Sequence, residues 1–523
     1  MKGIVTTVAA LALTLPALPA FAAGHKHSAP AASSLSKPME STTHGTVTVE
    51  GHRISYDAKA GTIILKNQAG KPTVSMFYVA YMKRGVKNPA DRPITFLYNG
   101  GPGSSSMWLH MGAFGPVRVG TADHTHTPPA PYKLVNNDYS LLDATDLVFI
   151  DAPSTGFSRL ITKAKGGAAK AKHFYSVDGD GHAFAQFITR FLVQNNRWNS
   201  PKYLFGESYG TTRSAVLSRY LETEDDVDLN GVVLLSAILS YDLGNDDSPQ
   251  FNPGMPLTYE LALPTYAATA WYHHKVPNQP KDLQGFLTQV EHFAMHGYAD
   301  ALNAGNALSA TDKQQIAEQL HKYTGLPAAY WVKANLRVNG GEFTKTLLSD
   351  SDNTTGRLDT RFVGPTMDPL SQEAHYDPQA AAISSAYVAL FNGYVRHTLD
   401  FKPDLLYRPE YYGSVLAHWD YLHAPPGSHG ELDQATNVMP DLAAAMKYNP
   451  DLKVMLNAGY FDLATPFYSA VYEMEHLPIP QTLTKNITYH YYESGHMVYV
   501  HVPSLKKLHD NVAAFIQSTE NTH

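Results

Sequence analysis

The pentapeptide GESYG at residues 206–210 places Ser208 between two glycines in the pattern Gly-x-Ser-x-Gly. Apolar residues at 202–205 predict a strand before it, and the pattern over 211–221 predicts a helix after it. A serine on so tight a turn from strand to helix exposes its hydroxyl as a nucleophile, and only small flanking residues fit. Chance gives about 0.2 such pentapeptides in a chain of this length, so this setting is what makes Ser208 a candidate nucleophile.

Ser208 needs a base nearby and a third group that orients the base. Two turns late in the chain offer them, because Asp462 follows a strand predicted at 453–456 and His496 follows one predicted at 487–492. Turns after parallel strands lie at one edge of a sheet, so the three side chains can meet there. A single histidine among 25 is usually a core or surface residue. The order Ser, Asp, His, the two turns and the tight serine turn together favour a catalytic triad.

A glycine-rich segment, NGGPGSSS at residues 99–106, follows the strand predicted at 94–98. Its backbone N–H groups can bind an anion, either a phosphate or the oxyanion of an acyl-transfer reaction. A phosphate loop of the Walker A type needs a lysine before its Ser or Thr, and this segment has none. We therefore interpret it as one half of an oxyanion hole, with the N–H of Tyr209 as the other half.

Apolar runs that alternate with helical patterns predict the elements that hold these turns in place. Because the runs are short and continuously apolar, they are typical of strands buried on both faces of a mostly parallel sheet. An antiparallel hairpin over 46–49 and 62–65, with a turn at Gly61, and a strand at 74–82 are expected first. Further strands are expected at 94–98, 147–150, 202–205, 232–235, 453–456 and 487–492, and helices at 182–193, 211–221 and 504–516. The predicted fold class is α/β, with helices on both faces of the sheet.

The alternation of strands and helices breaks between residues 241 and 450. No convincing pair of buried strands is predicted in this stretch. Helical patterns separated by Pro and Gly turns occupy it, at 266–273, 281–296, 311–323 and 379–390. We predict a largely helical cap, inserted over the carboxyl edge of the sheet, that divides the core into residues 46–240 and 451–523.

The N-terminus has the three parts of a secretion signal. A lysine stands near the start, an apolar stretch extends to residue 20, and small residues at 20–22 fit a cleavage site. A membrane anchor is the alternative, but two prolines interrupt a stretch that is already short for spanning. We predict a signal peptide over 1–22, a flexible leader over 23–45, and an exported protein, periplasmic or secreted, without stable insertion in a membrane.

The composition excludes several kinds of site. The chain has no cysteine, so cysteine catalysis, thiolate metal sites and iron–sulfur clusters are impossible. Its net charge is −7 without a block of lysine or arginine, which argues against nucleic acid as a partner. The pairs His273-His274 and His124 with His126 lack the spacing and the carboxylates of a metal site. We predict no metal and no cofactor, and the sequence makes no prediction of the oligomeric state.

Five segments together resemble the signature motifs of the serine carboxypeptidase family, and they occur in the family's order. The glycine-rich segment is similar to the NGGPG-x-SS signature, and GESYG is similar to the nucleophile motif. The segments are 99–106, 151–158, 206–210, 459–462 and 495–498. The resemblance runs from about residue 74 to 505, with the insertion recognised only by its position. It implies the α/β-hydrolase fold, and the lack of cysteine fits a bacterial exported branch of the family.

The resemblance implies an activity, which is release of the C-terminal residue from peptides with a free C-terminus. In the family pattern, Asn99, the backbone of Gly100 and a protonated Glu207 would hold the terminal carboxylate of the substrate. Gly101 and Tyr209 would supply the N–H groups of the oxyanion hole. Glu207 and the terminal carboxylate of the substrate cannot both stay ionised when they are in contact, so one must keep a proton. Activity is therefore expected to be favoured at mildly acidic pH.

Two positions depart from the family pattern. The family usually has a second acidic residue shortly before a Gly-Pro pair, where this chain has Ala113. The aromatic residue common two places before Asn99 is replaced by Leu97. We therefore expect the carboxylate pair with a shared proton to be missing, the recognition of the leaving carboxylate to be altered and the preference for acid to be weaker.

Two other functions are compatible with the same scaffold. An esterase or acyltransferase would use the same triad, so the triad residues cannot distinguish it from a peptidase. A binding module without catalysis would have lost a triad residue or broken the glycine-rich segment, and neither change is present. The sequence therefore favours an enzyme.

Overall fold

The computed structural model describes residues 35–244 and 253–521. The predicted signal peptide at 1–22 and the leader up to residue 34 lie outside this part of the chain. Strand β1 (Glu40–Val49) begins earlier than predicted, so residues 40–45, assigned above to the leader, belong to the sheet. This stretch is polar and half-exposed at the edge of the sheet, which explains why no apolar run marks it.

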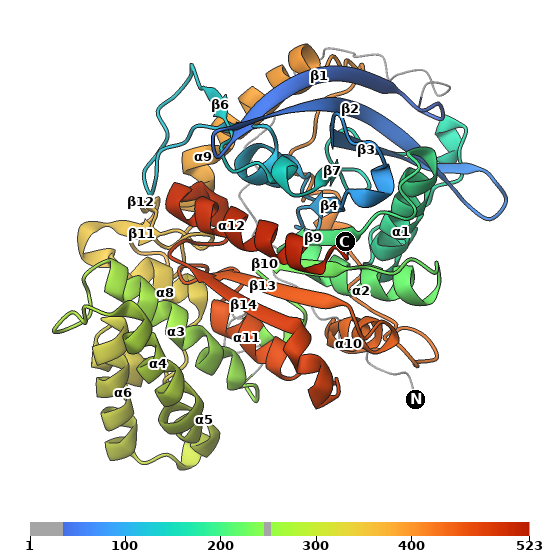
Figure 1. Ribbon diagram of the computed structural model, residues 1–523. Coiled ribbons are helices and arrows are strands. Elements are labelled where there is room, and N and C mark those ends of the chain that lie inside the picture. The colour runs from blue at the N-terminus through green and yellow to red at the C-terminus, as the bar shows by residue number, and fades with distance from the viewer. Residues whose placement is uncertain (1–34, 245–252, 522–523) are drawn as a thin grey trace.

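A ten-stranded sheet crosses the centre of the described residues, and helices cover both of its faces (Figure 1). Its order is β1-β2-β3-β7-β4-β9-β10-β13-β14, with the short strand β8 paired to β3. Neighbouring strands from β7 to β14 are parallel, whereas β1, β2 and β3 are antiparallel. The α/β class and the mostly parallel core predicted from the apolar runs are confirmed.

Strands β3, β4, β7, β9, β10, β13 and β14 fall within three residues of the runs predicted for them, whereas β2 begins well before the run predicted at 62–65 and β8 was not predicted. Gly61 lies inside β2, however, and the first hairpin turns at Glu50 and Gly51 instead. The bounds after β1 are β2 (His52–Lys66), β3 (Pro72–Lys83), β4 (Ile94–Tyr98), β7 (Asp146–Ile150), β8 (Arg159–Leu160), β9 (Lys202–Glu207), β10 (Gly231–Leu235), β13 (Lys453–Gly459) and β14 (Ile487–Tyr492). A separate small pair consists of β5 (Val117–Val119) and β6 (Leu134–Asn136).

Successive side chains of the central strands face two different hydrophobic clusters, because side chains alternate along a strand. Val233 and Leu235 of β10 pack on the face covered by α9 (Pro378–Gly393), α12 (Val502–Thr519) and a π-helical turn (Leu109–Phe114). Val232 and Leu234 pack on the other face. That face is covered by α1 (Val177–Gln194), α2 (Tyr209–Thr223), α10 (Met439–Tyr448) and α11 (Phe467–Glu475).

The insertion between β10 and β13 contains a helical group with its own hydrophobic cluster. Its helices are α3 (Leu257–Tyr272), α4 (Leu283–Phe293), α5 (Ala299–Ala304), α6 (Ala310–Thr324), α7 (Ala328–Lys333) and α8 (Gly340–Leu347). A short antiparallel pair, β11 (Asn353–Thr355) and β12 (Val363–Pro365), follows them, although no strand pair was predicted there. Helices α9 and α10 pack with the core strands, so the insertion predicted to end at residue 450 includes two helices that cover the sheet.

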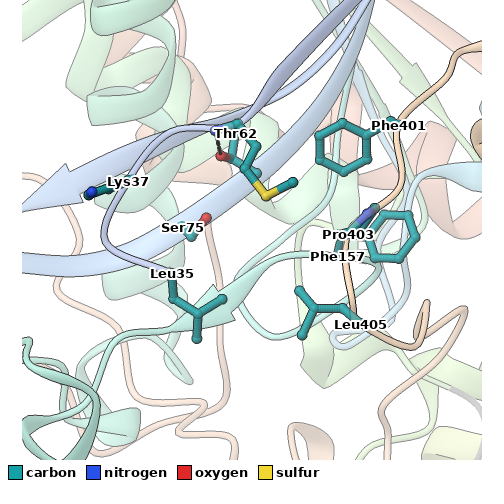
Figure 2. Close-up of a pocket in the computed structure, with 9 residues that line it drawn as sticks. Leu35, Lys37, Thr62, Ser75, Phe157, Phe401, Pro403 and Leu405 are labelled. Carbon is teal, nitrogen blue, oxygen red and sulfur yellow. Dashed lines mark hydrogen bonds between the residues drawn. The ribbon is translucent and has the colours of Figure 1, made fainter. Parts of the chain in front are cut away.

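A cavity of about 20 Å³ lies where the N-terminal segment before β1 crosses Phe157 and the end of the insertion (Figure 2). Leu35 and Phe401 are among its walls, and Lys37 points away from it. Met39 donates its backbone N–H to the hydroxyl of Thr62 at 2.9 Å, which ties the segment to β2. None of the predicted site residues lines this cavity.

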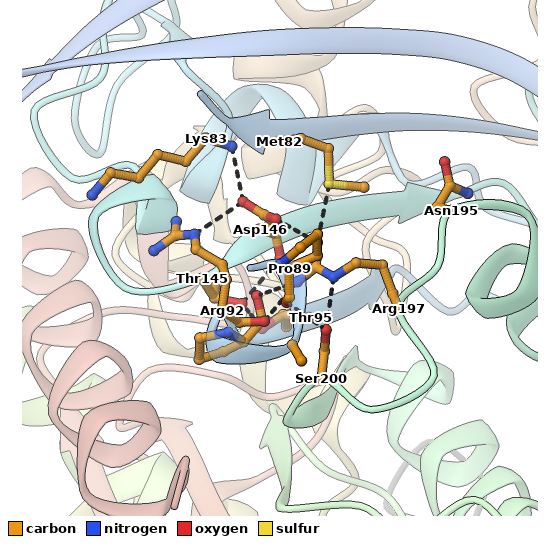
Figure 3. Close-up of polar contacts among 12 residues, drawn as sticks. Met82, Lys83, Pro89, Arg92, Thr95, Thr145, Asp146, Asn195, Arg197 and Ser200 are labelled. Carbon is orange, nitrogen blue, oxygen red and sulfur yellow. Dashed lines mark hydrogen bonds and ion pairs between the residues drawn. The ribbon is translucent and has the colours of Figure 1, made fainter. Parts of the chain in front are cut away.

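A buried ion-pair cluster holds the amino ends of the parallel strands together (Figure 3). Asp146, the first residue of β7, pairs with Arg92 at 3.0 Å and with Arg197. Arg197 also donates to the carbonyl of Arg92 at 2.6 Å. All three side chains are buried. Since the predicted site residues follow the carboxyl ends of the strands, this cluster lies at the opposite edge of the sheet.

Among residues 35–244 and 253–521, no helix has both the length and the apolar character needed to cross a membrane.

Candidate active site

Ser208 stands on the sharp turn between β9 and α2. Its φ of 62° and ψ of −132° are unusual for a residue other than glycine, and such a conformation costs about 1–3 kcal/mol. The backbone N–H of Ser208 donates to the carbonyl of Leu235 at 3.0 Å, which fixes the turn to the neighbouring strand β10. The side chain is partly exposed, although both adjacent residues are buried. This is the geometry expected of a serine nucleophile on a tight turn.

The two glycines around Ser208 are required by close packing. A Cβ atom on Gly206 would overlap the carbonyl group of Gly210 one turn later. A Cβ atom on Gly210 would lie 2.9 Å from the carbonyl oxygen of Tyr98 in β4. The two glycines are therefore needed because helix α2 approaches the sheet closely, as the sequence motif predicts.

His496 and Asp462 are in direct contact. The Nδ1 atom of His496 lies 2.8 Å from Oδ2 of Asp462, and both side chains are buried. Asp462 Oδ1 accepts the backbone N–H groups of Ala464 at 2.9 Å and Thr465 at 3.0 Å, and Oδ2 also accepts the hydroxyl of Thr465 at 2.7 Å. With its oxygens occupied in this way, Asp462 holds the imidazole through Nδ1 and leaves Nε2 as the proton acceptor.

The charge of Asp462 changes the titration of His496. Burial by itself would lower the pKa of His496, but the carboxylate of Asp462 outweighs it, and the net pKa lies above its ordinary value. Glu207 acts in the same direction, and Arg357 opposes it. Because the base must be neutral to accept a proton, activity that depends on His496 is lost as the pH falls through this raised pKa.

The tight turn that carries Ser208 and the His496–Asp462 pair lie at the same edge of the sheet. The hydroxyl of Ser236, the residue after β10, donates to the carbonyl of His496 at 2.8 Å, and the N–H of Ser236 donates to Asn457 of β13 at 2.9 Å. Glu207, next to Ser208, interacts electrostatically with both His496 and Asp462. The structure therefore brings the three residues predicted as a triad to one edge.

The glycine-rich segment packs directly against the start of helix α2. A Cβ atom on Gly100 would overlap the backbone nitrogen of Tyr209. Gly101 has a φ of +112°, a region open to glycine and strained for other residues. Tyr209 is the first residue of α2, so its N–H has no partner within the helix. The N–H groups predicted as an oxyanion hole thus belong to two adjoining turns.

Glu207 and Asn99 form a buried polar pair beside the nucleophile. Burial raises the pKa of Glu207 to about 7, opposed by the charge of His496 and by hydrogen bonds from Tyr499 and Asn99. The hydroxyl of Tyr499 donates to Oε1 of Glu207 at 3.3 Å. Asn99 accepts the N–H of Leu109 at 3.0 Å through its Oδ1, which orients its amide NH₂ as a donor. Near neutral pH the site therefore holds a carboxyl group that can be protonated beside an amide donor.

Ala113 is buried in the π-helical turn, at the place where an acidic residue was noted as missing. The neighbouring Gly112 lies against two tyrosines, Tyr387 and Tyr499. The charges that act on Glu207 include those of His496 and Asp462, and burial is the largest cause of its raised pKa. Burial, and not a second carboxyl from this turn, is therefore the main cause of the raised pKa of Glu207.

Several residues of the site were not found from the sequence. Thr465 and Tyr499 each stand three residues after a triad residue, and only this spacing could have suggested them. Trp419 of the insertion packs edge-to-face on Tyr209 with ring centroids 5.1 Å apart. Tyr412, also of the insertion, lies over Gly101. These last contacts join segments that are far apart in sequence, so no local pattern predicts them.

His273, one of the histidines considered as metal ligands, has another partner. His273 Nε2 lies 2.6 Å from the carbonyl of Thr360. In the described part of the chain, Glu50, His509 and Asp510 come close enough to share an ion, but Lys506 pairs with both carboxylates, at 3.3 and 2.7 Å. Nothing in this arrangement calls for a metal, and the prediction of a reaction without one stands as a prediction.

Comparisons with known proteins find similarity to serine carboxypeptidase-like proteins. The serine carboxypeptidase-like 2 protein of Arabidopsis thaliana is 26% identical over 194 residues, which cover 35% of this chain and 41% of that protein. Serine carboxypeptidase-like 12 of the same plant is 24% identical over 274 residues, or 50% of this chain and 58% of that protein. The match thus spans less than two thirds of the length of these relatives.

The crystal structure of Kex1, a prohormone-processing carboxypeptidase from Saccharomyces cerevisiae, covers 88% of this chain and 92% of its own. The TM-score is 0.53 at 15% sequence identity, so the likeness concerns the fold, and it confirms the predicted α/β-hydrolase architecture. The family model described as serine carboxypeptidase matches residues 59–519. Because that match spans well over half of the chain, this chain belongs to the serine carboxypeptidase family.

Proposed function

We propose that this protein is a serine carboxypeptidase that releases C-terminal residues from peptides through an acyl-enzyme on Ser208. The observation that carries the proposal is the buried Glu207 beside the His496–Asp462 pair. An esterase needs the triad alone, whereas a protonated carboxyl next to the amide of Asn99 suits the free carboxylate of a peptide. Prohormone-processing carboxypeptidase activity is named for the yeast structure of the same fold.

In the proposed mechanism, Ser208 Oγ attacks the scissile carbonyl while Nε2 of His496 takes its proton. Asp462 holds Nδ1–H of His496 and stabilises the imidazolium that forms. The N–H groups of Gly101 and Tyr209 bind the oxyanion. His496 then gives the proton to the leaving amine, and a water activated by the same imidazole hydrolyses the acyl-enzyme.

Asn99, the backbone N–H of Gly100 and protonated Glu207 are proposed to bind the terminal carboxylate of the substrate. Each supplies a donor, and donors to a carboxylate form stronger hydrogen bonds than neutral pairs do. The N–H of Gly100 lies in the turn that packs against Tyr209, so the bound carboxylate would sit close to the oxyanion hole. The scissile bond, which joins the residue to be released to the rest of the peptide, would then lie within reach of Ser208.

A panel of peptides with free and amidated C-termini, analysed by mass spectrometry, tests this function. We expect the wild type to shorten free peptides by one residue at a time. It should cleave amidated peptides at least about 100-fold more slowly, because the amide removes the charge that Asn99 and Glu207 bind. Equal rates on both would point to an esterase or acyltransferase instead. Ser208→Ala is the control for contaminating peptidases.

Glu207→Gln is expected to change the pH dependence of peptide cleavage. Below about pH 7 the raised pKa of Glu207 keeps it protonated and able to donate, so wild-type kcat/KM for peptides falls about tenfold per pH unit above that value. Glutamine donates at any pH, so kcat/KM of the variant for peptides should fall by less than about threefold between pH 7 and 8.5. Ester substrates, which have no carboxylate to bind, serve as the control, and their kcat/KM between pH 7 and 8.5 should be the same in the variant as in the wild type. Their acid limb should move to lower pH, because the charge of Glu207 contributes to the raised pKa of His496. An unchanged peptide profile would remove Glu207 from carboxylate binding.

We further propose that the protein is exported after cleavage near residue 22 and is periplasmic or secreted, in a bacterial branch of the family. The three-part N-terminal pattern and the absence of cysteine support this. The division into a core at 46–240 and 451–523 and a cap at 241–450 is proposed likewise, with α9 and α10 assigned to the layers that cover the sheet. N-terminal sequencing of the mature protein tests the cleavage site.

A further inference from the structure

A hairpin of the insertion reaches the two loops that carry Asp462 and His496. It consists of β11, β12 and the loop between them, residues 353–365, and is called the cap hairpin below. Its loop is closed by the N–H of Gly356, which donates to the carbonyl of Phe362 at 2.8 Å. Figure 1 shows β11 and β12 between α9 and the helices α3 and α8, and both α8 and α9 contact the hairpin.

The loop of His496 is bonded to the cap hairpin through consecutive backbone amides. The N–H of His496 donates to the carbonyl of Leu358 at 2.6 Å. The N–H of Gly495, the residue before it, donates to the carboxylate of Asp359. The approach is so close that a Cβ atom on Gly495 would overlap Asp359 and the carbonyl of Leu358. The backbone that carries the catalytic imidazole is therefore held from the side of the insertion.

The loop of Asp462 is bonded to the same hairpin on both sides of the carboxylate. The N–H of Leu463 donates to the carbonyl of Arg357 at 3.0 Å, and the N–H of Thr360 donates to the carbonyl of Phe461 at 2.9 Å. The side chains of Phe461 and Leu463 belong to the hydrophobic cluster of the helical insertion. One short hairpin thus bonds to residues next to the proposed acid and to the proposed base.

Asp359 and Arg361 form a buried ion pair within the hairpin loop. The Nε and Nη2 atoms of Arg361 lie 3.0 and 2.6 Å from the two carboxylate oxygens of Asp359. Nη1 of Arg361 also donates to Asp123 at 3.1 Å. Burial by itself would lower the pKa of Arg361, but the charges of Asp359 and Asp123 outweigh it, so the pKa is raised and the guanidinium stays charged. Removing one partner of such a pair leaves an uncompensated charge in the interior.

We propose that the cap hairpin is a positioning element of the active site, in which Asp359 and Arg361 set how Asp462 and His496 meet. Asp359 and Arg361 act on the reaction through backbone bonds to these loops and do not touch the substrate. The inference rests on the triad in the proposed function. Because a displacement of about 1 Å in catalytic geometry can lower a rate about 100-fold, the hairpin couples the insertion to the chemistry that it covers.

Asp359→Asn tests the proposal, since asparagine keeps the size of the side chain and loses its charge. We expect kcat on a small ester to fall about 10- to 100-fold with little change in KM. The acid limb of kcat/KM should also move to lower pH. Asp462 and Glu207 raise the pKa of His496 and Arg357 lowers it, so a weaker contact with Asp462 lets that pKa fall. Asp123, Tyr272 and His501 interact electrostatically with Arg361 and are left unchanged.

The matched control is Asp146→Asn, which makes the same change in the buried cluster of Figure 3 at the other edge of the sheet. It should lower the urea midpoint of unfolding and leave both kcat and the acid limb within error of the wild type. A shift of the acid limb in this control as large as that in Asp359→Asn would mean that general loss of stability causes the effect, and it would overturn the proposal.

The rate at which a fluorophosphonate labels Ser208 gives a readout that does not need peptide recognition. Labelling still needs the base, so its pH profile should shift in Asp359→Asn as the ester profile does. A wild type that is labelled and cleaves no peptide would refute the proposed function while leaving this inference testable. Arg361→Lys, which keeps the charge and loses the paired donors, should give a smaller change of about 3- to 10-fold. Rates and acid limbs equal to the wild type in both folded variants would overturn the proposal.

Discussion

We expect Ser208→Ala to lower kcat for free peptides by about 10⁴- to 10⁶-fold, because no other group can form the acyl-enzyme. The dissociation constant of a free peptide should stay within about threefold of its value for the wild type, since Asn99 and Glu207 are untouched. Calorimetry on Ser208→Ala measures this binding directly, because the variant does not consume the peptide. A loss of binding together with the loss of rate would indicate a disturbed site and not a missing nucleophile.

The residues of a triad act as a unit, which gives the Ser208 experiment an internal control. The double variant Ser208→Ala with His496→Ala should be no slower than either single variant by more than about tenfold. Ser208→Gly is a second control, because glycine adopts positive φ without the strain present at 62° and should raise the melting temperature. A variant that is more stable and yet inactive separates the loss of chemistry from unfolding.

Five of the six parallel strands could be predicted because each is buried on both faces and therefore forms a continuous apolar run, as in 232–235. The tight serine turn could be predicted for the same reason, since it needs small residues at fixed positions next to such a run. The sixth parallel strand, β14, lies at the edge of the sheet and is only partly buried. The edge strand β1 could be predicted only in part. Its first residues, ESTTHG, are polar because one side of them faces solvent.

The positions of Asp462 and His496 could be predicted from the turns that follow two strands, but their environment could not. The cap hairpin bonds to their loops from a distant segment of the chain. Tyr499 likewise reaches Glu207 from far along the sequence, and Thr465 bonds to Asp462 from three residues away. The strands of the hairpin have three residues each, too few for a periodic pattern. The backbone carbonyls of Arg357 and Leu358 accept the hydrogen bonds from these loops. Every residue has a backbone carbonyl, so no residue type marks the contact.

Helix α10 shows why the layer to which a helix of the insertion belongs could not be predicted. Its sequence is amphipathic in the same way as that of the inserted helices, and a pattern shows only that one face is buried. The structure shows which surface covers that face. Leu442 and Met446 pack with strand residues of the core, whereas Leu287 of α4 packs within the helical group. Membership of a layer is a property of tertiary contacts and not of the helix alone.

Asp462→Asn is the variant whose effect the hydrogen bonds define most sharply. In the wild type, Oδ1 of Asp462 accepts two backbone N–H groups, from Ala464 and Thr465. An asparagine should therefore place its oxygen there and its NH₂ where Oδ2 now contacts His496. An amide NH₂ can only donate, so Nδ1 of His496 must accept and the proton moves to Nε2. The imidazole then has no free nitrogen to take the proton of Ser208.

We therefore expect kcat for both peptide and ester to fall about 10⁴-fold in Asp462→Asn, with KM changed less than about threefold. Thr465→Val is the matched control, because it removes one hydrogen bond to the same oxygen and leaves the carboxylate in place. Thr465→Val should lower kcat by about tenfold at most. If Asp462→Asn kept more than about a tenth of the wild-type rate, Asp462 would not be the residue that orients His496. A large loss in the peptide rate alone would instead place Asp462 in substrate binding, because the ester reports the base and the nucleophile without the terminal carboxylate.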